Sequence, residues 1–322
     1  MTIPRHDEGM TRRGWLLFAL MSVLWGVSYL FIKIAIRELS PVVVVASRTG
    51  IAALVLVPLA LRRGLFRPLL SRARWVMLLA LLNVAAPFLL ISYGEVHITS
   101  SLTALLIAAE PILIAVLAWR MDQAERVTGV RALGLAVGLG GVAVLVGLDL
   151  GGDRVGLLGA AMVLLATVGY AASTLVVKRH FAEVPVVGVV AATMMVTTVL
   201  LAPFALAAAP HRLPSPKVAG ALLVLGLFCT ALALVAFYAL IAEAGAGRAA
   251  VITYVNPAVA VLLGVLLLGE ALTPAVVVGS LLILAGSFLS TRPMAEPAPR
   301  LQELQELQER DEPVVVTLGA NR

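Results

Sequence analysis

The stretch EPILIAVLAWRMDQAERVT, residues 110–128, has a counterpart in NPAVAVLLGVLLLGEALT, residues 256–273. In each stretch a proline precedes an apolar run, and a Glu lies just before a Thr at its end. Glycines follow that Glu at the ninth and sixteenth positions in both places. Landmarks repeated in one order at near-constant spacing predict that the chain contains two related halves.

The composition predicts that these halves lie in a bilayer. Apolar residues make up 61% of the 322 positions and charged residues 13%, against about 45–50% and about 25% in soluble domains. A span needs about 20 apolar residues, and it must be helical because no water satisfies free backbone groups there. Ten such runs are expected, at 14–36, 41–61, 75–94, 99–120, 129–148, 156–177, 185–208, 218–242, 247–269 and 273–291.

The basic residues predict the orientation of the spans. With a cytoplasmic N-terminus, 18 of the 24 Lys and Arg residues fall on the cytoplasmic side, five fall on the other side, and Arg48 lies within a span. This asymmetry favours both termini in the cytoplasm. It also accounts for the net charge of +6 without a nucleic-acid partner. Abundant Ala, Val and Arg beside only three Lys are typical of a protein from a GC-rich bacterial genome. This composition suggests a bacterial inner membrane.

The resulting fold class is an all-α integral membrane protein with ten transmembrane helices in two inverted five-helix repeats. Because each half has an odd number of spans, the second half enters the membrane from the opposite side, as is typical of secondary transporters. The expected segments are a cytoplasmic tail 1–13, a first repeat 14–148, an extracytoplasmic connection 149–155, a second repeat 156–291 and a cytoplasmic tail 292–322.

The chain resembles the EamA-like group of the drug/metabolite transporter superfamily. The resemblance rests on Trp25-Gly26 with Lys33, on the two stretches quoted above and on the paired glycines, and it covers residues 14–291. It implies a transporter of small solutes. The sequence departs from the family pattern at Gly169-Tyr170, which stands in place of a Trp-bearing motif.

Glu110 is the main candidate for a functional residue, since a charge in mid-membrane is costly and usually faces a cavity or a partner. Pro111 removes a backbone donor and opens carbonyl groups a turn upstream. Glu110 is expected to bind a proton or a substrate ammonium group, with Asn256-Pro257 presented from the opposite side. The structural alternative is a buried neutral or hydrogen-bonded Glu.

Arg48 lies seven residues into the second span. It is expected to neutralise a substrate carboxylate, to pair with Glu110 or to snorkel toward the headgroups. Trp25, near mid-membrane, either lines the substrate path or packs between helices. The hydroxyl groups of Tyr93, Tyr238 and Tyr254 are further candidates for the substrate path.

Other residues are assigned structural roles. Glu95 and Glu243 are expected at the membrane interface, near helix ends. Glu125 and Glu270 occupy matched positions and are expected to cap the helix that follows each of them. Glycines such as Gly134 are expected to allow close helix packing, within the monomer or in a homodimer.

The predicted function is secondary transport, most simply the export of small polar metabolites such as amino acids or drug-like solutes, with proton coupling through Glu110 or passive exchange. The alternatives are an intramembrane enzyme and a channel-like pore. The four His residues are scattered over tails and connections, which disfavours an enzyme. No P-loop is present, and the single cysteine, Cys229, gives neither a disulfide nor a metal site. No cofactor or metal is expected.

Overall fold

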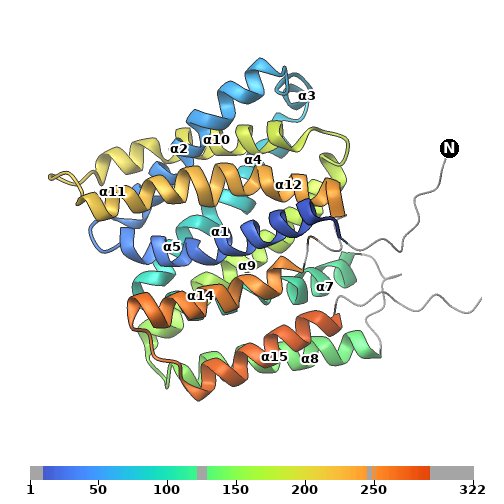
Figure 1. Ribbon diagram of the computed structural model, residues 1–322, viewed down its shortest axis with the longest axis vertical. Coiled ribbons are helices and arrows are strands. Elements are labelled where there is room, and N and C mark those ends of the chain that lie inside the picture. Colours follow the sequence, from blue (N-terminus) through green and yellow to red (C-terminus); the bar gives the residue numbers. More distant parts are fainter. Residues whose placement is uncertain (1–9, 122–128, 245–248, 250, 291–322) are drawn as a thin grey trace, which may run out of the picture. The chain divides into compact units, whose positions relative to one another are not determined.

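The computed structural model consists of helices, and the part of the chain that it describes contains no strand (Figure 1). The described residues are 10–121, 129–244, 249 and 251–290, without the side chains of 118–121 and 238. The C-terminal tail 292–322 and Glu125 therefore lie outside the described residues. Eight helical segments are long and apolar enough to cross a membrane, and two shorter apolar helices follow them. The predicted all-α membrane fold with about ten spans is confirmed.

The helices of the first half correspond to the first five apolar runs. They are α1 (Arg12–Ala35), α2 (Pro41–Arg62), α3 (Arg67–Leu70), α4 (Ala73–Ala80), the π-helix η1 (Leu81–Ala85), α5 (Ala86–His97), α6 (Ser100–Ile107), α7 (Glu110–Met121), α8 (Val130–Val144) and the π-helix η2 (Leu145–Asp149). The elements α4, η1 and α5 form one span, which runs over 73–97.

The helices of the second half repeat this order. They are α9 (Arg154–His180), α10 (Val186–Ala207), α11 (Pro216–Leu223), the π-helix η3 (Val224–Leu232), α12 (Ala233–Ala244), α14 (Ile252–Leu268) and α15 (Pro274–Ser290). The elements α11, η3 and α12 again form one span, which runs over 216–244. Thus a π-helix interrupts the third span of each half, and such π-helical turns are frequent at functional sites.

The packing of the helices follows the repeat. The first helix of the first half, α1, packs on α12 and α14, and the first helix of the second half, α9, packs on α5, α6 and α7. The two second helices, α2 and α10, pack on each other, and so do the two fifth helices, α8 and α15 (Figure 1). This exchange of equivalent partners between the halves is what a two-fold relation produces.

The glycines predicted to permit close packing lie in the contact between α8 and α15. A Cβ atom added at Gly141 would lie 2.8 Å from the backbone nitrogen of Ile283, and one at Gly134 would meet the backbone of Ser290. A Cβ atom at Gly286 would meet the backbone of Gly138. The glycines therefore allow close packing within one chain. They no longer support a homodimer through these helices, which stays a prediction.

The two prolines that were expected to break helices differ in effect. The fourth span is interrupted at residues 108–109, directly before Pro111, so that it forms the separate helices α6 and α7. In contrast, α14 continues through Pro257. The expected break at Pro257 is absent. This proline is only the sixth residue of its helix, and its missing N–H would have reached the carbonyl of Thr253 in the first turn. Its effect therefore falls on the first turn and leaves the rest of the helix unchanged.

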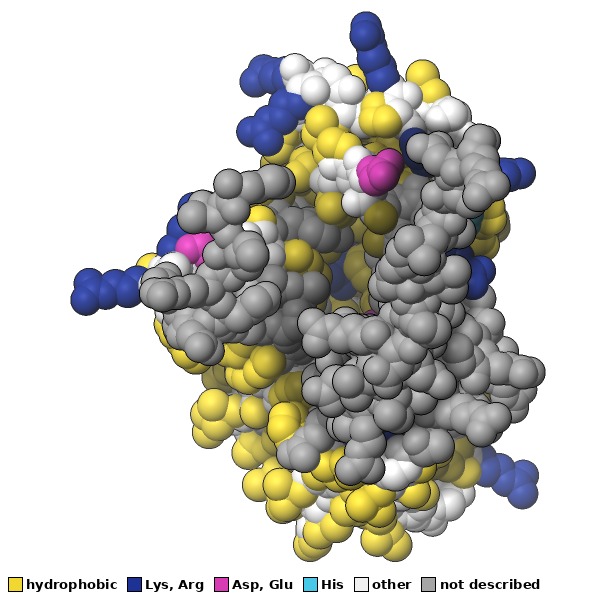
Figure 2. Space-filling model, turned by 90° about the vertical axis from the view of Figure 1, so that its right-hand side faces the viewer, with side chains coloured by type: hydrophobic (Ala, Val, Ile, Leu, Met, Phe, Trp, Pro, Cys, Tyr) yellow, Lys and Arg dark blue, Asp and Glu magenta, His cyan; other side chains and the backbone are white. Residues whose placement is uncertain are grey.

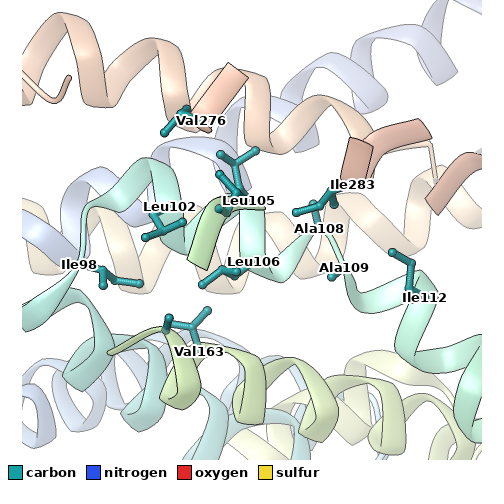
Figure 3. Packing of buried hydrophobic residues seen from close by; sticks show 12 residues of the cluster. Ile98, Leu102, Leu105, Leu106, Ala108, Ala109, Ile112, Val163, Val276 and Ile283 are labelled. Atoms are coloured by element: carbon teal, nitrogen blue, oxygen red, sulfur yellow. The ribbon is translucent and has the colours of Figure 1, made fainter. Parts of the chain in front are cut away.

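The interruption of the fourth span is packed in an apolar core. Ala108, Ala109 and Ile112 are at most 2% exposed. They belong to one hydrophobic cluster with Val163 of α9 and Ile283 of α15, and Figure 3 shows Ala108 beside Ile283. The break is thus held from both sides by the second half of the protein, so the position of α7 depends on packing between the two halves.

Candidate functional site

Glu110 is the first residue of α7. The turn before it is closed by hydrogen bonds from Ala109 N to Leu106 O (3.2 Å) and from Ile112 N to Ala109 O (3.0 Å). A helix N-terminus carries a partial positive charge, which stabilises a carboxylate in the first turn. The side chain is partly buried and accepts no hydrogen bond within the described part of the chain. Its acceptor capacity therefore remains open to a ligand or to water.

Arg48 points into the bundle, and its side chain is 7% exposed. Its Nε donates to Thr230 Oγ1 (2.7 Å) in η3, and its guanidinium lies 4.1 Å from the centre of the Phe88 ring. The expectation that Arg48 snorkels toward the headgroups is therefore wrong. The π-helix contributes to this arrangement, because Thr230 Oγ1 in turn donates to Leu225 O (2.8 Å). Neither terminal nitrogen of Arg48 donates a hydrogen bond within the described part of the chain.

Two tyrosines lie within electrostatic range of both Arg48 and Glu110. Tyr29 of α1 and Tyr170 of α9 each interact electrostatically with both charged groups, and also with each other. Arg48 and Glu110 form no direct ion pair. Tyr29 and Tyr170 are therefore shared electrostatic neighbours of a basic group on α2, Arg48, and an acidic group on α7, Glu110. Glu95 of α5 is a further acidic neighbour of Tyr29 and of Arg48. We call Arg48, Glu110, Tyr29 and Tyr170 the central polar site.

The two tyrosines were missed by the sequence analysis, although signals for both were present. Tyr29 lies four residues after Trp25, on the same face of α1. Tyr170 occupies the position at which the family pattern has a Trp-bearing motif. Arg48 itself lies in a segment that matches the second half, and its counterpart there is Ala192. The central polar site thus coincides with places where the two halves differ.

The remaining sequence candidates lie elsewhere. The ring of Trp25 packs on Phe237 of α12, with centroids 5.0 Å apart. In the amide orientation that its neighbours favour, the side-chain nitrogen of Asn256 donates to Ser22 O (3.2 Å), which ties α14 to α1. Tyr254 packs edge-on against Phe288 of α15 at 6.4 Å.

The last two candidates are tyrosines at matched positions in the two halves. Tyr93 is 41% exposed and makes no hydrogen bond to a residue of the central polar site. The side chain of Tyr238 lies outside the described residues. Of the sequence candidates, the structure therefore brings together Arg48 and Glu110 around shared neighbours.

A second polar group lies at the end of the bundle where α1 ends and α6 begins, which we call the α6 end (Figure 1). The carboxylate of Glu270 accepts from Ser100 N (2.8 Å), Ser100 Oγ (2.8 Å) and Ser101 N (3.0 Å). The expectation that Glu270 caps the helix that follows it is wrong. It caps α6 in the other half, because the close approach of Gly264 to Ser101 brings the two segments together. The following helix, α15, is capped by Thr273 Oγ1.

Glu95 lies at the same end and corrects a further expectation. Predicted at the membrane interface, its side chain is 0% exposed. Lys33 of α1 donates to the backbone carbonyls of Glu95 and of Ile98, the latter at 2.7 Å. Cations at a helix C-terminus stabilise the free carbonyl groups there, so Lys33 holds the end of α5 against α1.

The opposite end of the bundle, where α1 begins, carries several Lys and Arg side chains around its rim (Figure 2). Glu243 lies at this end, where it accepts from Thr11 Oγ1 (2.6 Å) and lies 3.7 Å from Arg13. The described residues contain no cluster of His, Cys, Asp or Glu that could hold a metal ion.

Comparisons with known proteins agree with this architecture. The model of the EamA-like transporter family matches the chain twice, over residues 12–147 and 157–292. A solved crystal structure superposes with a TM-score of 0.62 at 21% identity, covering 86% of this chain and 96% of that chain, so the two share a fold.

Several proteins similar to this chain are named as transporters. A protein of Archaeoglobus fulgidus, named as an uncharacterized transporter, is 26% identical over 86% of this chain and 98% of its own length. YedA of Escherichia coli K12, named as an uncharacterized inner membrane transporter, is 29% identical over 80% and 83%. A protein of Streptantibioticus cattleyicolor, named "Probable terminal-alkyne amino-acid exporter", is 28% identical over 88% and 94%. The resemblance noted in the sequence is confirmed.

Proposed function

Because the chain belongs to the EamA-like transporter family, we propose that it is a secondary transporter that exports small zwitterionic metabolites of the amino-acid class. The central polar site carries this proposal. It places a guanidinium and a carboxylate on different helices around two tyrosine side chains. A substrate with a carboxylate and an ammonium group complements these two charges.

Arg48 is proposed to bind the substrate carboxylate. Its Nε is already held by Thr230, which leaves the two terminal nitrogens for a ligand. Two parallel N–H donors match the two oxygens of a carboxylate. Phe88, stacked on the guanidinium, holds the planar group in one orientation. The deep position of Arg48 favours a functional charge, since an unpaired charge within the membrane is costly.

Glu110 is proposed to bind the substrate ammonium group, with a proton in its place when the carrier is empty. Exchange of the two ligands at one carboxylate would couple export to proton entry. The break before α7 supports this role, because interrupted spans form the binding sites of many secondary transporters. Tyr29 and Tyr170, in electrostatic range of both charges, are proposed to supply hydroxyl groups for the substrate.

Alternating access supplies the route. The contacts between equivalent helices of the two halves allow one half to rock against the other about the central site. The name of the Streptantibioticus relative supports both the direction of transport and the substrate class. No feature of the site favours either alternative, an intramembrane enzyme or a channel-like pore.

The test is exchange of labelled amino acids across sealed proteoliposomes containing the purified protein. Arg48→Gln should raise KM at least about tenfold for amino acids, since a hydrogen bond to a charged group contributes about 1.5–3 kcal/mol. It should have little effect on the corresponding amines, which lack the carboxylate. Glu110→Gln should weaken transport of amino acids but not of the corresponding deaminated carboxylic acids.

The exposed residues Arg212 and Glu183 provide matched controls. Arg212→Gln and Glu183→Gln should transport as the wild type does. An absence of flux for all amino acids and amines would overturn the proposed function. Equal loss for amino acids and amines in Arg48→Gln would remove Arg48 from carboxylate recognition.

We also propose a plasma-membrane location with both termini in the cytoplasm, which the basic rim of the bundle supports (Figure 2). In a chain carrying Cys229→Ala, a membrane-impermeant maleimide added to whole cells should label Leu213→Cys, in the 96% exposed loop position before α11. It should not label Ser71→Cys, in the connection before α4. The reverse pattern would overturn this orientation.

A further inference from the structure

The side chain of Glu95 is an acid enclosed by protein. It is 0% exposed, and neither of its carboxylate oxygens has a hydrogen-bond partner within the described part of the chain. An ionised carboxylate leaves water only when paired and hydrogen-bonded, because the loss of hydration is otherwise uncompensated. Geometry alone therefore selects the neutral form of Glu95 in this conformation.

None of the ionisable groups around Glu95 makes a hydrogen bond with its carboxylate. On α1, the Lys33 ammonium donates to the carbonyls at the end of α5. On α2, Arg48 donates to Thr230, and in the connection before α15, Glu270 caps α6. Tyr29 of α1 is the remaining ionisable group in electrostatic range.

The helix α9 packs along α5, and beside Gly94, the residue before Glu95, it presents the side chain of Val163 and the backbone carbonyl of Gly159. No cation thus approaches Glu95 from α9 to take the place of a hydrogen-bond partner. The carboxylate thus lies in electrostatic range of several ionisable groups, and none of them donates a hydrogen bond to it.

The fold itself does not require an acid at this position. In the register set by Tyr93 and Tyr238, the counterpart of Glu95 in the second half is Leu240, which is also 0% exposed. In the register set by the two prolines it is Ile241. The same structural position is filled by an apolar side chain in the other half, so packing at this position does not require a carboxylate.

We propose that Glu95 is a proton-binding site, and that the α6 end closes only when this carboxylate holds a proton. The inference rests on the proposed transport function, because alternating access requires this end to open. When the Glu270 cap leaves α6, water reaches Glu95, and the carboxylate ionises beside Lys33. On closing, a carboxylate oxygen takes up one proton from the solution, and on opening it releases the proton to the solution.

The proposal fixes how strongly pH shifts the ratio of open and closed forms. If the open form is ionised at Glu95 and the closed form is protonated, each pH unit shifts the ratio of the two forms about tenfold. Low pH on the side of the α6 end therefore favours closure. In a carrier that exports its substrate toward this side, the acid outside a bacterial cell would favour return of the empty protein.

Infrared spectroscopy tests protonation without measuring transport. The wild type near neutral pH should show the carbonyl stretch of a buried carboxylic acid, and the difference spectrum between wild type and Glu95→Gln should contain it. Glu183→Gln should leave the band unchanged. If Glu95→Gln fails to fold, Glu95→Leu, the residue found at the counterpart Leu240, replaces it. A difference spectrum with only an ionised carboxylate would overturn the proposal.

Labelling of Ile98→Cys in the Cys229→Ala chain tests the link to closure. Ile98 is 4% exposed at the α6 end, and Leu213→Cys, on a fully open loop, corrects for the pH dependence of the reagent. The corrected rate should fall up to about tenfold per pH unit on acidification. It should be independent of pH in Glu95→Gln and remain pH-dependent in Glu110→Gln. An unchanged pH dependence in Glu95→Gln would overturn the proposal.

Neither measurement depends on a known substrate. If both give the expected result and no solute is transported, the proposed function fails and the proton site stands. If amino acids are exchanged and the infrared and labelling experiments fail, the transport function stands without a proton site at Glu95.

Discussion

Removing the Glu270 carboxylate should destabilise the protein by a magnitude set by the start of α6. The backbone N–H groups of Ser100 and Ser101 both donate to this carboxylate, and the next, that of Leu102, donates to Thr99 Oγ1 (3.1 Å). All three donors at the beginning of the helix are therefore satisfied, two of them by a residue of the other half.

Glu270→Ala leaves two main-chain donors and two hydroxyl groups without their acceptor. A buried donor without a partner costs about 1–3 kcal/mol, which gives about 2–6 kcal/mol for the two N–H groups. Because Glu270 is only partly buried, water replaces some of the lost bonds. We therefore expect the free energy of unfolding to fall by about 2–4 kcal/mol. Glu270→Gln keeps an acceptor oxygen and should lose about half as much.

The measurement is reversible unfolding of the detergent-solubilised protein in increasing SDS, followed by circular dichroism. The matched control is Glu183→Ala, which removes an exposed carboxylate from the connection before α10 and should change stability by less than about 0.5 kcal/mol. A loss of less than about 0.5 kcal/mol in Glu270→Ala would refute the argument that this carboxylate holds α6. Equal losses in the two variants would do the same.

Two further predictions concern packing and pH. Gly138→Leu should lower the free energy of unfolding by about 1–3 kcal/mol or more, since a Cβ atom there meets Ile112; Gly140→Leu, with nothing within 4 Å, should be tolerated, and equal losses would contradict this account. Hydrogen bonds from Ser215 Oγ (2.6 Å) and N (2.8 Å) lower the pKa of Glu38 below its ordinary value of 4.5. The stability that this lowered pKa contributes is complete above the ordinary value and is lost as the pH falls through the folded-state pKa. The melting temperatures of wild type and Glu38→Gln should thus converge on acidification, and a constant difference would show that the contact is not linked to protonation.

The fold followed from the sequence because a bilayer restricts the choices. An apolar run of sufficient length must be a helix there, so composition and run length predicted the helices. The repeat of Glu125 and Glu270 with their glycines identified the two halves, and the glycines marked the contact of α8 with α15. The helix break before Glu110 was likewise readable, because Pro111 removes a donor in mid-span.

The candidate site could be predicted from the sequence only in part. Arg48 and Glu110 were identified because charges are rare within apolar runs. Such a charge can be recognised in the sequence without knowing which residues surround it in the fold. The roles of Glu95 and Glu270 were missed, since both lie near the ends of apolar runs and hydropathy places such residues at the interface. Their burial depends on which helix ends meet.

The sequence by itself thus determined the class of the protein: helices in a membrane, two halves, and a few charges at depth. Only the tertiary structure decided what those charges face. The Glu270 cap joins segments about 170 positions apart in the chain, and Arg48 meets Thr230 across 182 positions. Contacts of this kind come from packing between the halves, where helix crossing and side-chain volume set the geometry, and no local pattern encodes them.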